Sequence, residues 1–135
     1  MFRNHRIEYL VLIVLLVGVV AGCAGGGHVR TEATPLANGS NLITIEAGNY
    51  KFKPNEIRVA RPGTLVLEIK NISGSEHNFT LKNARGEILK DLKIRPKDTA
   101  ISNVDLEPGT YQFYCNKQFH TKLGMKGQII VETAK

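Results

Sequence analysis

Short alternating segments separated by turn residues run through the chain from residue 42 onward. Residues 42–47 and 64–71 alternate apolar with other side chains, a period of two that is typical of strands with one buried face. Turn residues such as Arg61-Pro62-Gly63 and Glu107-Pro108-Gly109 divide these segments. We therefore expect an all-β, antiparallel sandwich or barrel of seven or eight strands around one modest core. The other expected strands cover residues 50–52, 57–59, 77–81, 99–106, 111–115 and 127–133, and residues 88–94 fit a strand or a short helical turn.

The first 22 residues are typical of a targeting segment and are left out of the fold. A basic start precedes an apolar run over residues 9–20, which as a helix is roughly 18 Å long and too short for a hydrocarbon core of about 30 Å. Val20-Ala21-Gly22-Cys23 resembles the bacterial lipobox, where cleavage precedes a cysteine that receives lipid. This predicts a lipoprotein held by Cys23 on the extracytoplasmic face of a bacterial membrane, on its periplasmic or cell-surface side. An ordinary signal peptide or a short anchor helix is the alternative.

The rest of the chain divides by composition into a tether and a domain. Residues 23–41 are rich in Gly, Ala, Thr, Asn and Ser, which predicts a lipidated flexible tether, and residues 42–135 form the expected domain. Only two cysteines are present, so lipid on Cys23 leaves Cys115 without a disulfide partner. A free thiol is a liability in an oxidising compartment unless something occupies it, and a metal would do so. A Cys23–Cys115 disulfide is the alternative.

The formal net charge of the chain is +6. Its basic residues are dispersed, with no basic block and no repeat of aromatic and basic residues, so a solvated surface is favoured over a nucleic-acid site. We expect a monomer that does not bind nucleic acid.

The stretch that begins at the last residue of the expected strand at residues 111–115 carries three side chains of metal-binding type at equal spacing. Cys115, His120 and Met125 are five residues apart. A thiolate, an imidazole and a thioether suit copper, because zinc sites rarely use Met, whereas a His₂Cys plane with a weak axial Met is the electron-transfer copper arrangement. The second histidine would be His77, which starts a strand after a Ser/Gly loop, since His28 lies in the predicted tether. Each residue alone has an ordinary alternative as a surface histidine or a core methionine.

Together these residues resemble the cupredoxins, the small blue copper proteins. The resemblance covers about residues 42–133 and rests on Asn71, His77-Asn78, the run from Leu106 to Cys115, and His120 with Gly124-Met125. The wide Cys-x4-His-x4-Met spacing is similar to auracyanin and rusticyanin. The resemblance implies a Greek-key β-sandwich with one type 1 copper ion at one end, bound by His77, Cys115, His120 and Met125.

The resemblance also implies roles for several neighbouring residues. Asn78 would link the two ligand loops and help to hold the cysteine, although an Asn on a strand can also make only a local turn contact. Tyr111 would pin a corner of the sandwich through its hydroxyl. His120 would be the exit for the electron, beside Phe119 and Leu123. Three lysines near it in sequence, which an ordinary solvated rim would also explain, are predicted to steer docking to an acidic partner: Lys117, Lys122 and Lys126.

The function expected from the sequence is a membrane-tethered carrier of single electrons between redox proteins. A protein that delivers or holds copper outside the cytoplasm is the alternative. We expect no enzyme activity, because an oxidase or nitrite reductase needs a second type of copper site with further histidines, and the chain beyond residue 22 has only His28 in addition to the proposed ligands. A binuclear copper centre needs a second cysteine in the ligand loop, and residues 116–119 contain none.

Overall fold

The computed structural model describes residues 28–133, which form eleven strands and no helix. The predicted targeting segment and the predicted lipidation site at Cys23 lie outside these residues, and within them no helical segment is long and apolar enough to span a bilayer. The strands are β1 (Arg30–Glu32), β2 (Thr34–Pro35), β3 (Asn41–Gly48), β4 (Lys51–Lys53), β5 (Glu56–Val59), β6 (Gly63–Asn71), β7 (His77–Lys82), β8 (Ile88–Ile94), β9 (Thr99–Leu106), β10 (Gly109–Tyr114) and β11 (Lys126–Val131).

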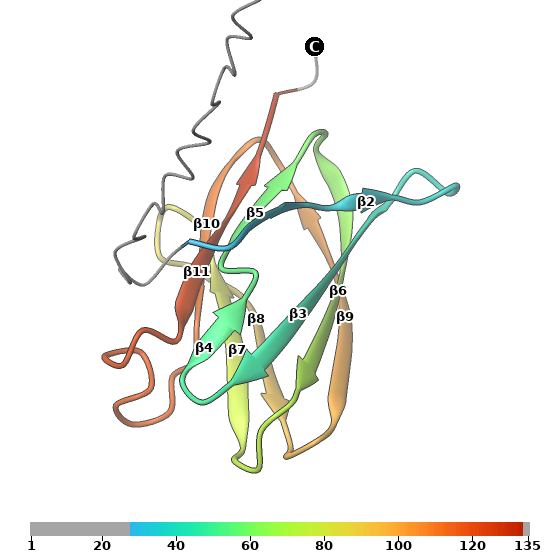
Figure 1. Ribbon diagram of the computed structural model, residues 1–135. Helices are drawn as coiled ribbons and strands as arrows, with labels where there is room; N and C mark the ends of the chain where they lie inside the picture. The colour runs from blue at the N-terminus through green and yellow to red at the C-terminus, as the bar shows by residue number, and fades with distance from the viewer. Residues whose placement is uncertain (1–27, 134–135) are drawn as a thin grey trace, which may run out of the picture.

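Two sheets face each other as a sandwich (Figure 1). One has the order β1-β5-β11-β10-β7-β8, and the other has the order β2-β3-β6-β9 with β4 on β3. The predicted all-β sandwich is confirmed. The expectation of purely antiparallel pairing is wrong, because β3 pairs with β6 and β5 with β11 in parallel. The link from β3 to β6 crosses to the opposite sheet through β5, and such a crossover is what parallel pairing requires.

The count of eleven strands exceeds the expected seven or eight. β4 lies at the strand expected over residues 50–52, but β1 and β2 were not expected. They have three and two residues, too few for an alternating pattern to stand out in the sequence. Residues 88–94 form β8, a strand rather than a helical turn, because they pair along β7 from His77 opposite Ile94 to Lys82 opposite Ile88.

The core fills the space between the sheets with the apolar face of each strand. β6 buries Leu65, Leu67 and Ile69 at every second position. The rings of Phe52, Phe79 and Phe113 meet with centroids 5.0–5.6 Å apart. Burying each ring stabilises the folded state by about 1.5–3 kcal/mol. The cluster therefore stabilises β4, β7 and β10, the strands that carry these three rings.

The predicted flexible tether is wrong from Arg30 onward. β1 pairs in parallel with β5, the Val29 amide donates to Asn55 Oδ1 at 2.7 Å, and Arg30 Nε lies 2.6 Å from Glu56 Oε1. The segment therefore covers an edge of β5 that would otherwise leave backbone groups unpaired. It shows no strand pattern in the sequence because its side chains are mostly exposed, so neither face carries an apolar repeat.

Three connections meet at one end of the sandwich. The β3–β4 turn, the β6–β7 loop and the long β10–β11 loop lie together in the lower part of Figure 1. The predicted tyrosine corner lies near the start of β10, away from the end that leads to Cys115, where the Tyr111 hydroxyl donates to the Glu107 carbonyl at 2.9 Å. β11 begins with a close approach: a Cβ on Gly127 would lie 2.3 Å from the Phe113 ring and 2.4 Å from the Asn55 carbonyl. Only glycine fits there.

Candidate metal centre

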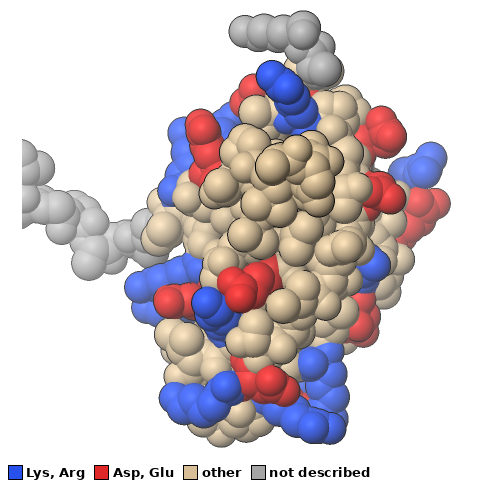
Figure 2. Space-filling view, turned by 90° about the vertical axis from the view of Figure 1, so that its right-hand side faces the viewer, with Lys and Arg blue, Asp and Glu red and all other residues tan. Residues whose placement is uncertain are grey.

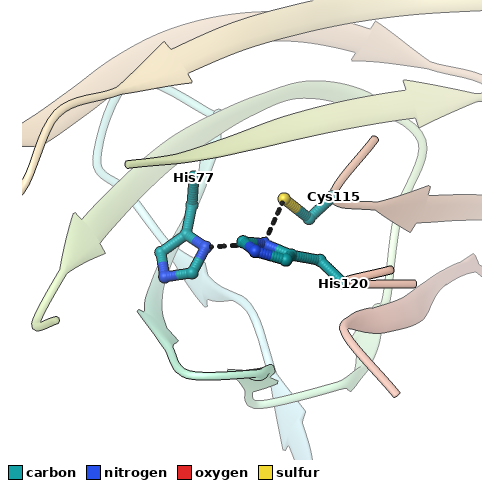
Figure 3. Close-up of side chains that lie close together, drawn as sticks. All are labelled: His77, Cys115 and His120. Atoms are coloured by element: carbon teal, nitrogen blue, oxygen red, sulfur yellow. Dashed lines mark hydrogen bonds between the residues drawn. The ribbon is translucent and has the colours of Figure 1, made fainter. Parts of the chain in front are cut away.

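Three of the predicted ligands converge at this end of the molecule (Figure 3). One donor atom of each of His77, Cys115 and His120 lies within 4.8 Å of the others. The Nδ1 atoms of the two histidines are 3.3 Å apart, and the Cys115 Sγ lies 3.4 Å from His120 Nδ1. His77 and Cys115 are fully buried and His120 is half-buried. The segments that carry them are far apart in sequence and are brought together by the packing of β7 beside β10.

The β10–β11 loop is closed by its own backbone. The Cys115 amide donates to the Met125 carbonyl and the Met125 amide donates to the His120 carbonyl, both at 3.0 Å, while the Thr121 hydroxyl donates to the Cys115 carbonyl at 2.5 Å. Gly124, with φ of +100°, adopts the backbone that this return needs. Met125 is fully buried, and its carbonyl accepts a backbone hydrogen bond from Cys115, so the loop holds these two residues next to each other.

A hydrogen-bond network fixes which nitrogen of His77 carries the proton. Its Nε2 lies 2.9 Å from Ser73 Oγ and 3.1 Å from Asn49 Oδ1. The amide oxygen of Asn49 can only accept, so Nε2 must carry the hydrogen that is shared with it. The Nδ1 atom, which faces Cys115 and His120, is then left with a free lone pair for a metal.

The Ser73 hydroxyl is itself held so that it can accept this hydrogen. It lies 2.8 Å from Asn71 Oδ1 and receives the Ser75 amide hydrogen at 3.1 Å. The Asn71 side-chain amide donates to three carbonyls, those of Ser75, Ile94 and Arg95, at 2.7–3.1 Å, which fixes its oxygen toward Ser73. The hydroxyl hydrogen can be donated to Asn71 Oδ1 or to the Ser75 carbonyl, 3.1 Å away, which leaves the hydroxyl oxygen able to accept the hydrogen on His77 Nε2.

Sequence reasoning missed Asn49 and Ser73 as residues that orient a ligand. The signals for them were weak, because a Gly-Asn pair and a Ser-Gly-Ser run read only as turns.

Asn78 connects the segment that carries His77 to the segment that carries Cys115. Its Oδ1 accepts the Asn116 amide hydrogen at 2.7 Å, and its Nδ2 donates to Thr80 Oγ1 at 3.0 Å and to Asp91 Oδ1 at 2.7 Å. Its backbone amide also points at the Cys115 Sγ at 3.5 Å. The residue after the first histidine thus anchors the residue after the cysteine and supplies an N–H to the sulfur. Asp91, from β8, was not foreseen in this role.

Burial and nearby positive charge both favour the neutral form of His77. Burial lowers the pKa of His77 below its ordinary value, and positive charge on His120 and Lys117 acts in the same direction. Glu76 forms ion pairs with Lys117 and with Lys93. The hydrogen bond from Lys117, followed by that from Lys93, lowers the pKa of Glu76, and the same contact raises the pKa of Lys117. Lys117 is therefore paired with a carboxylate that it shares with Lys93.

Apolar side chains are exposed beside His120. Phe119 and Leu123 are each 59% exposed. The Tyr50 ring, 41% exposed, meets the His120 ring edge-on at a centroid distance of 4.7 Å. Of the lysines predicted around this area, Lys122 lies over the Phe119 ring at 5.9 Å and Lys126 is exposed at the start of β11.

The family model for a cupredoxin-like domain matches residues 12–131 of the chain. The chain belongs to the cupredoxin family. Family membership and the His–Cys–His group together support one copper ion in this cupredoxin, and the donor set fits that metal, since a thiolate with two imidazoles is suited to copper. Within the described residues this is the one group of three or more His, Cys, Asp or Glu side chains that could hold a metal ion.

Solved structures share the fold. An auracyanin from Roseiflexus castenholzii is 23% identical, with a TM-score of 0.59 over 67% of this chain and 95% of that one. Auracyanin A, a "blue" copper protein from Chloroflexus aurantiacus, is 20% identical, with a TM-score of 0.61 over 70% of this chain and 100% of that one. The metal-binding domain of the Cu(I)-exporting P-type ATPase CopA from Streptococcus pneumoniae, solved with Cu(I), is 18% identical, with a TM-score of 0.58 over 78% of this chain and 98% of that one.

Proposed function

We propose that this cupredoxin carries single electrons between redox proteins by cycling one type 1 copper ion between Cu(II) and Cu(I). The proposed ligands are the Nδ1 atoms of His77 and His120, the thiolate of Cys115 and, as a weak fourth donor, the thioether of Met125. The observation that carries the proposal is the convergence of two imidazole nitrogens and one sulfur within 4.8 Å at a largely buried site. That set, with a long axial Met, is the arrangement of electron-transfer copper proteins.

The surrounding residues supply the conditions for rapid transfer. Copper, when bound, supplies the one-electron chemistry. Ser73 and Asn49 hold the His77 ring by its far nitrogen, and the Asn78 amide points at the Cys115 sulfur. Such contacts orient metal ligands and tune the redox potential. Because the sandwich fixes them, little rearrangement would accompany a change of oxidation state.

The electron would leave through His120. Its half-buried ring lies beside the exposed Phe119 and Leu123, an apolar area against which a redox protein could pack. Lys122 and Lys126 would steer such a partner electrostatically. Lys117, paired with Glu76, would contribute less.

The proposal places the protein at the extracytoplasmic face of a bacterial membrane through lipid on Cys23. It is supported by the lipobox-like sequence before Cys23. Because β1 begins at Arg30, only six residues separate Cys23 from the sandwich, and the seven steps from Cys23 to Arg30 span at most about 25 Å when fully extended. The domain would therefore stay close to the membrane. Labelling with a radioactive fatty acid should mark the wild-type chain and not Cys23→Ala, and equal labelling would rule out this anchor.

The copper assignment is tested by the optical and electron paramagnetic resonance spectra of the copper-loaded chain. An intense visible band from thiolate-to-copper charge transfer is expected, and Cys115→Ser should abolish it. Reversible bleaching by a one-electron reductant with no loss of copper would complete the test. Colourless copper binding in the wild type would contradict the electron-transfer proposal.

A second candidate is a protein that holds or delivers copper. It is favoured by one observation, the shared fold with the Cu(I)-bound domain of the Streptococcus pneumoniae exporter. Such a protein would lack the intense colour and would release Cu(I) to a competing chelator, whereas an electron carrier should keep its copper through repeated reduction and oxidation.

A further inference from the structure

An open hollow lies next to the metal centre, between β4 and the β10–β11 hairpin. Its volume is about 1210 Å³, and its lining residues come mainly from four strands, the β3–β4 turn and the β10–β11 loop. The buried Phe113, a member of the aromatic core cluster, and the closely packed Gly127 are among its lining residues. The hollow is therefore backed by the rigid core.

The charged groups that line this hollow are all positive. They are Lys51 and Lys53 on β4, Lys82 on β7 and Lys126 on β11. No Asp or Glu is among the described residues that line it, and none of the four lysines forms an ion pair within residues 28–133. The surface over β6 and β9, on the right of Figure 1, differs from the hollow in its charge. Figure 2 shows this surface, on which basic and acidic side chains are interspersed.

The hollow is continuous with the proposed electron exit. Tyr50 and Leu123 line it, and the Tyr50 ring is the one that touches His120 at 4.7 Å. Thr121, which follows His120, lines it as well. A molecule seated in the hollow would therefore lie against the residues that flank His120.

We propose that this lysine-lined hollow is the docking site for an acidic, protruding segment of the redox partner. The proposal rests on the electron-transfer function proposed above and specifies its partner. Uncompensated positive charge attracts an acidic surface and raises the rate of encounter. A concave site favours a protruding loop or terminus over the flat surface of a membrane. The site shares Lys126 with the lysines near His120 in sequence, but it adds Lys51, Lys53 and Lys82. It leaves out Lys117, which is paired with Glu76, and Lys122, which lies over the Phe119 ring.

The test measures electron transfer from the reduced, copper-loaded chain of residues 23–135 carrying Cys23→Ser, which keeps all eleven strands. The electron passes from Cu(I) to ferricyanide, which becomes ferrocyanide, and octaglutamate is added as a competitor that mimics an acidic segment. In the first variant, called the groove variant, the four lysines of the hollow are replaced by Gln. The matched variant makes the same change of charge at four other unpaired basic residues: Arg61, Lys90, Arg95 and Lys97.

The wild type and the matched variant should react rapidly at low ionic strength, slow down as salt is added, and be inhibited by octaglutamate. The groove variant should react about tenfold more slowly at low salt, with a flatter salt dependence and no inhibition. If Lys82→Gln disturbs folding through its contact with the Tyr114 ring, 5.3 Å away, the variant with the other three changes serves instead. Equal rates, salt dependence and inhibition in the groove and matched variants would overturn the proposal.

Two further measurements distinguish a missing copper site and a membrane partner from the proposed docking. The visible spectrum is recorded for the wild type and for each variant. If the wild type lacks the thiolate-to-copper band, the copper proposal fails, and the docking proposal is not what has been refuted. Co-sedimentation with vesicles of phosphatidylcholine and phosphatidylglycerol tests a membrane as the occupant. Binding to these vesicles that depends on the four lysines, with no effect of octaglutamate, would reject an acidic protein in favour of anionic lipid.

Discussion

Asn78→Ala should destabilise the metal-free chain by about 3 kcal/mol. The side chain is 5% exposed and makes three hydrogen bonds, with Asn116, Thr80 and Asp91. Each hydrogen bond contributes about 1 kcal/mol net, and one to a charged group contributes about 1.5–3 kcal/mol. We assign the hydrogen bond to Asp91 the low end of this range, because Asp91 is exposed to solvent. Alanine would also leave the Asn116 amide without its partner.

Urea unfolding of the metal-free protein, followed by far-ultraviolet circular dichroism, measures this loss. Metal must be absent because a ligand that binds only the folded state would mask it. With a denaturant slope of about 1.5 kcal/mol per molar, the midpoint should fall by roughly 2 M with the slope unchanged. Asn103→Ala is the control, since Asn103 is exposed on β9 and its loss should cost at most about 0.5 kcal/mol.

The same variant tests the link between stability and the metal centre. Without the bond to Asn78, the Asn116 amide no longer fixes the start of the ligand loop, so the visible spectrum of the copper-loaded variant should differ from that of the wild type. A midpoint within about 0.5 M of the Asn103→Ala value, or an unchanged spectrum, would refute the assignment of Asn78 as the residue that joins the two ligand segments.

Three further predictions concern single contacts. Gly127→Ala should cost at least about 3 kcal/mol of unfolding free energy, because its methyl would lie 2.3 Å from a core phenylalanine ring and 2.4 Å from a carbonyl oxygen; a urea midpoint equal to that of the wild type would contradict this close approach. Hydrogen bonds from Lys117 and then Lys93 lower the pKa of Glu76, so the stabilising effect of the ionised Glu76 is present above its ordinary pKa and is lost as the pH falls through the lowered pKa. A nuclear magnetic resonance titration should show that Lys117→Gln raises the pKa of Glu76, and an unchanged pKa would refute the pairing. Ser73→Ala should shift the reduction potential and the visible band of the copper-loaded chain by loosening His77, with recovery in Ser73→Thr, whereas identical spectra in all three proteins would show that the hydroxyl does not position the ring.

The local strand pattern was readable where a strand has one buried and one more exposed face. β9 covers residues 99–106, the range expected from the sequence, and β6 buries every second residue. β1 was missed because it is an exposed edge strand whose pairing depends on β5, more than twenty residues away. β8 was ambiguous because its burial is irregular, and only its pairing with β7 decides between strand and helix.

The sequence by itself determined the types of donor at the metal centre and the two-residue period that makes the fold all-β, because both are local properties of neighbouring side chains. Tertiary structure decided what surrounds those donors. It brought Asn49 and Ser73 to the far side of the His77 ring, paired Lys117 with Glu76, and gathered lysines from three strands into one hollow. These contacts join positions up to 75 residues apart, from Lys51 to Lys126, and depend on how the strands align and how the sheets pack, which no local pattern encodes.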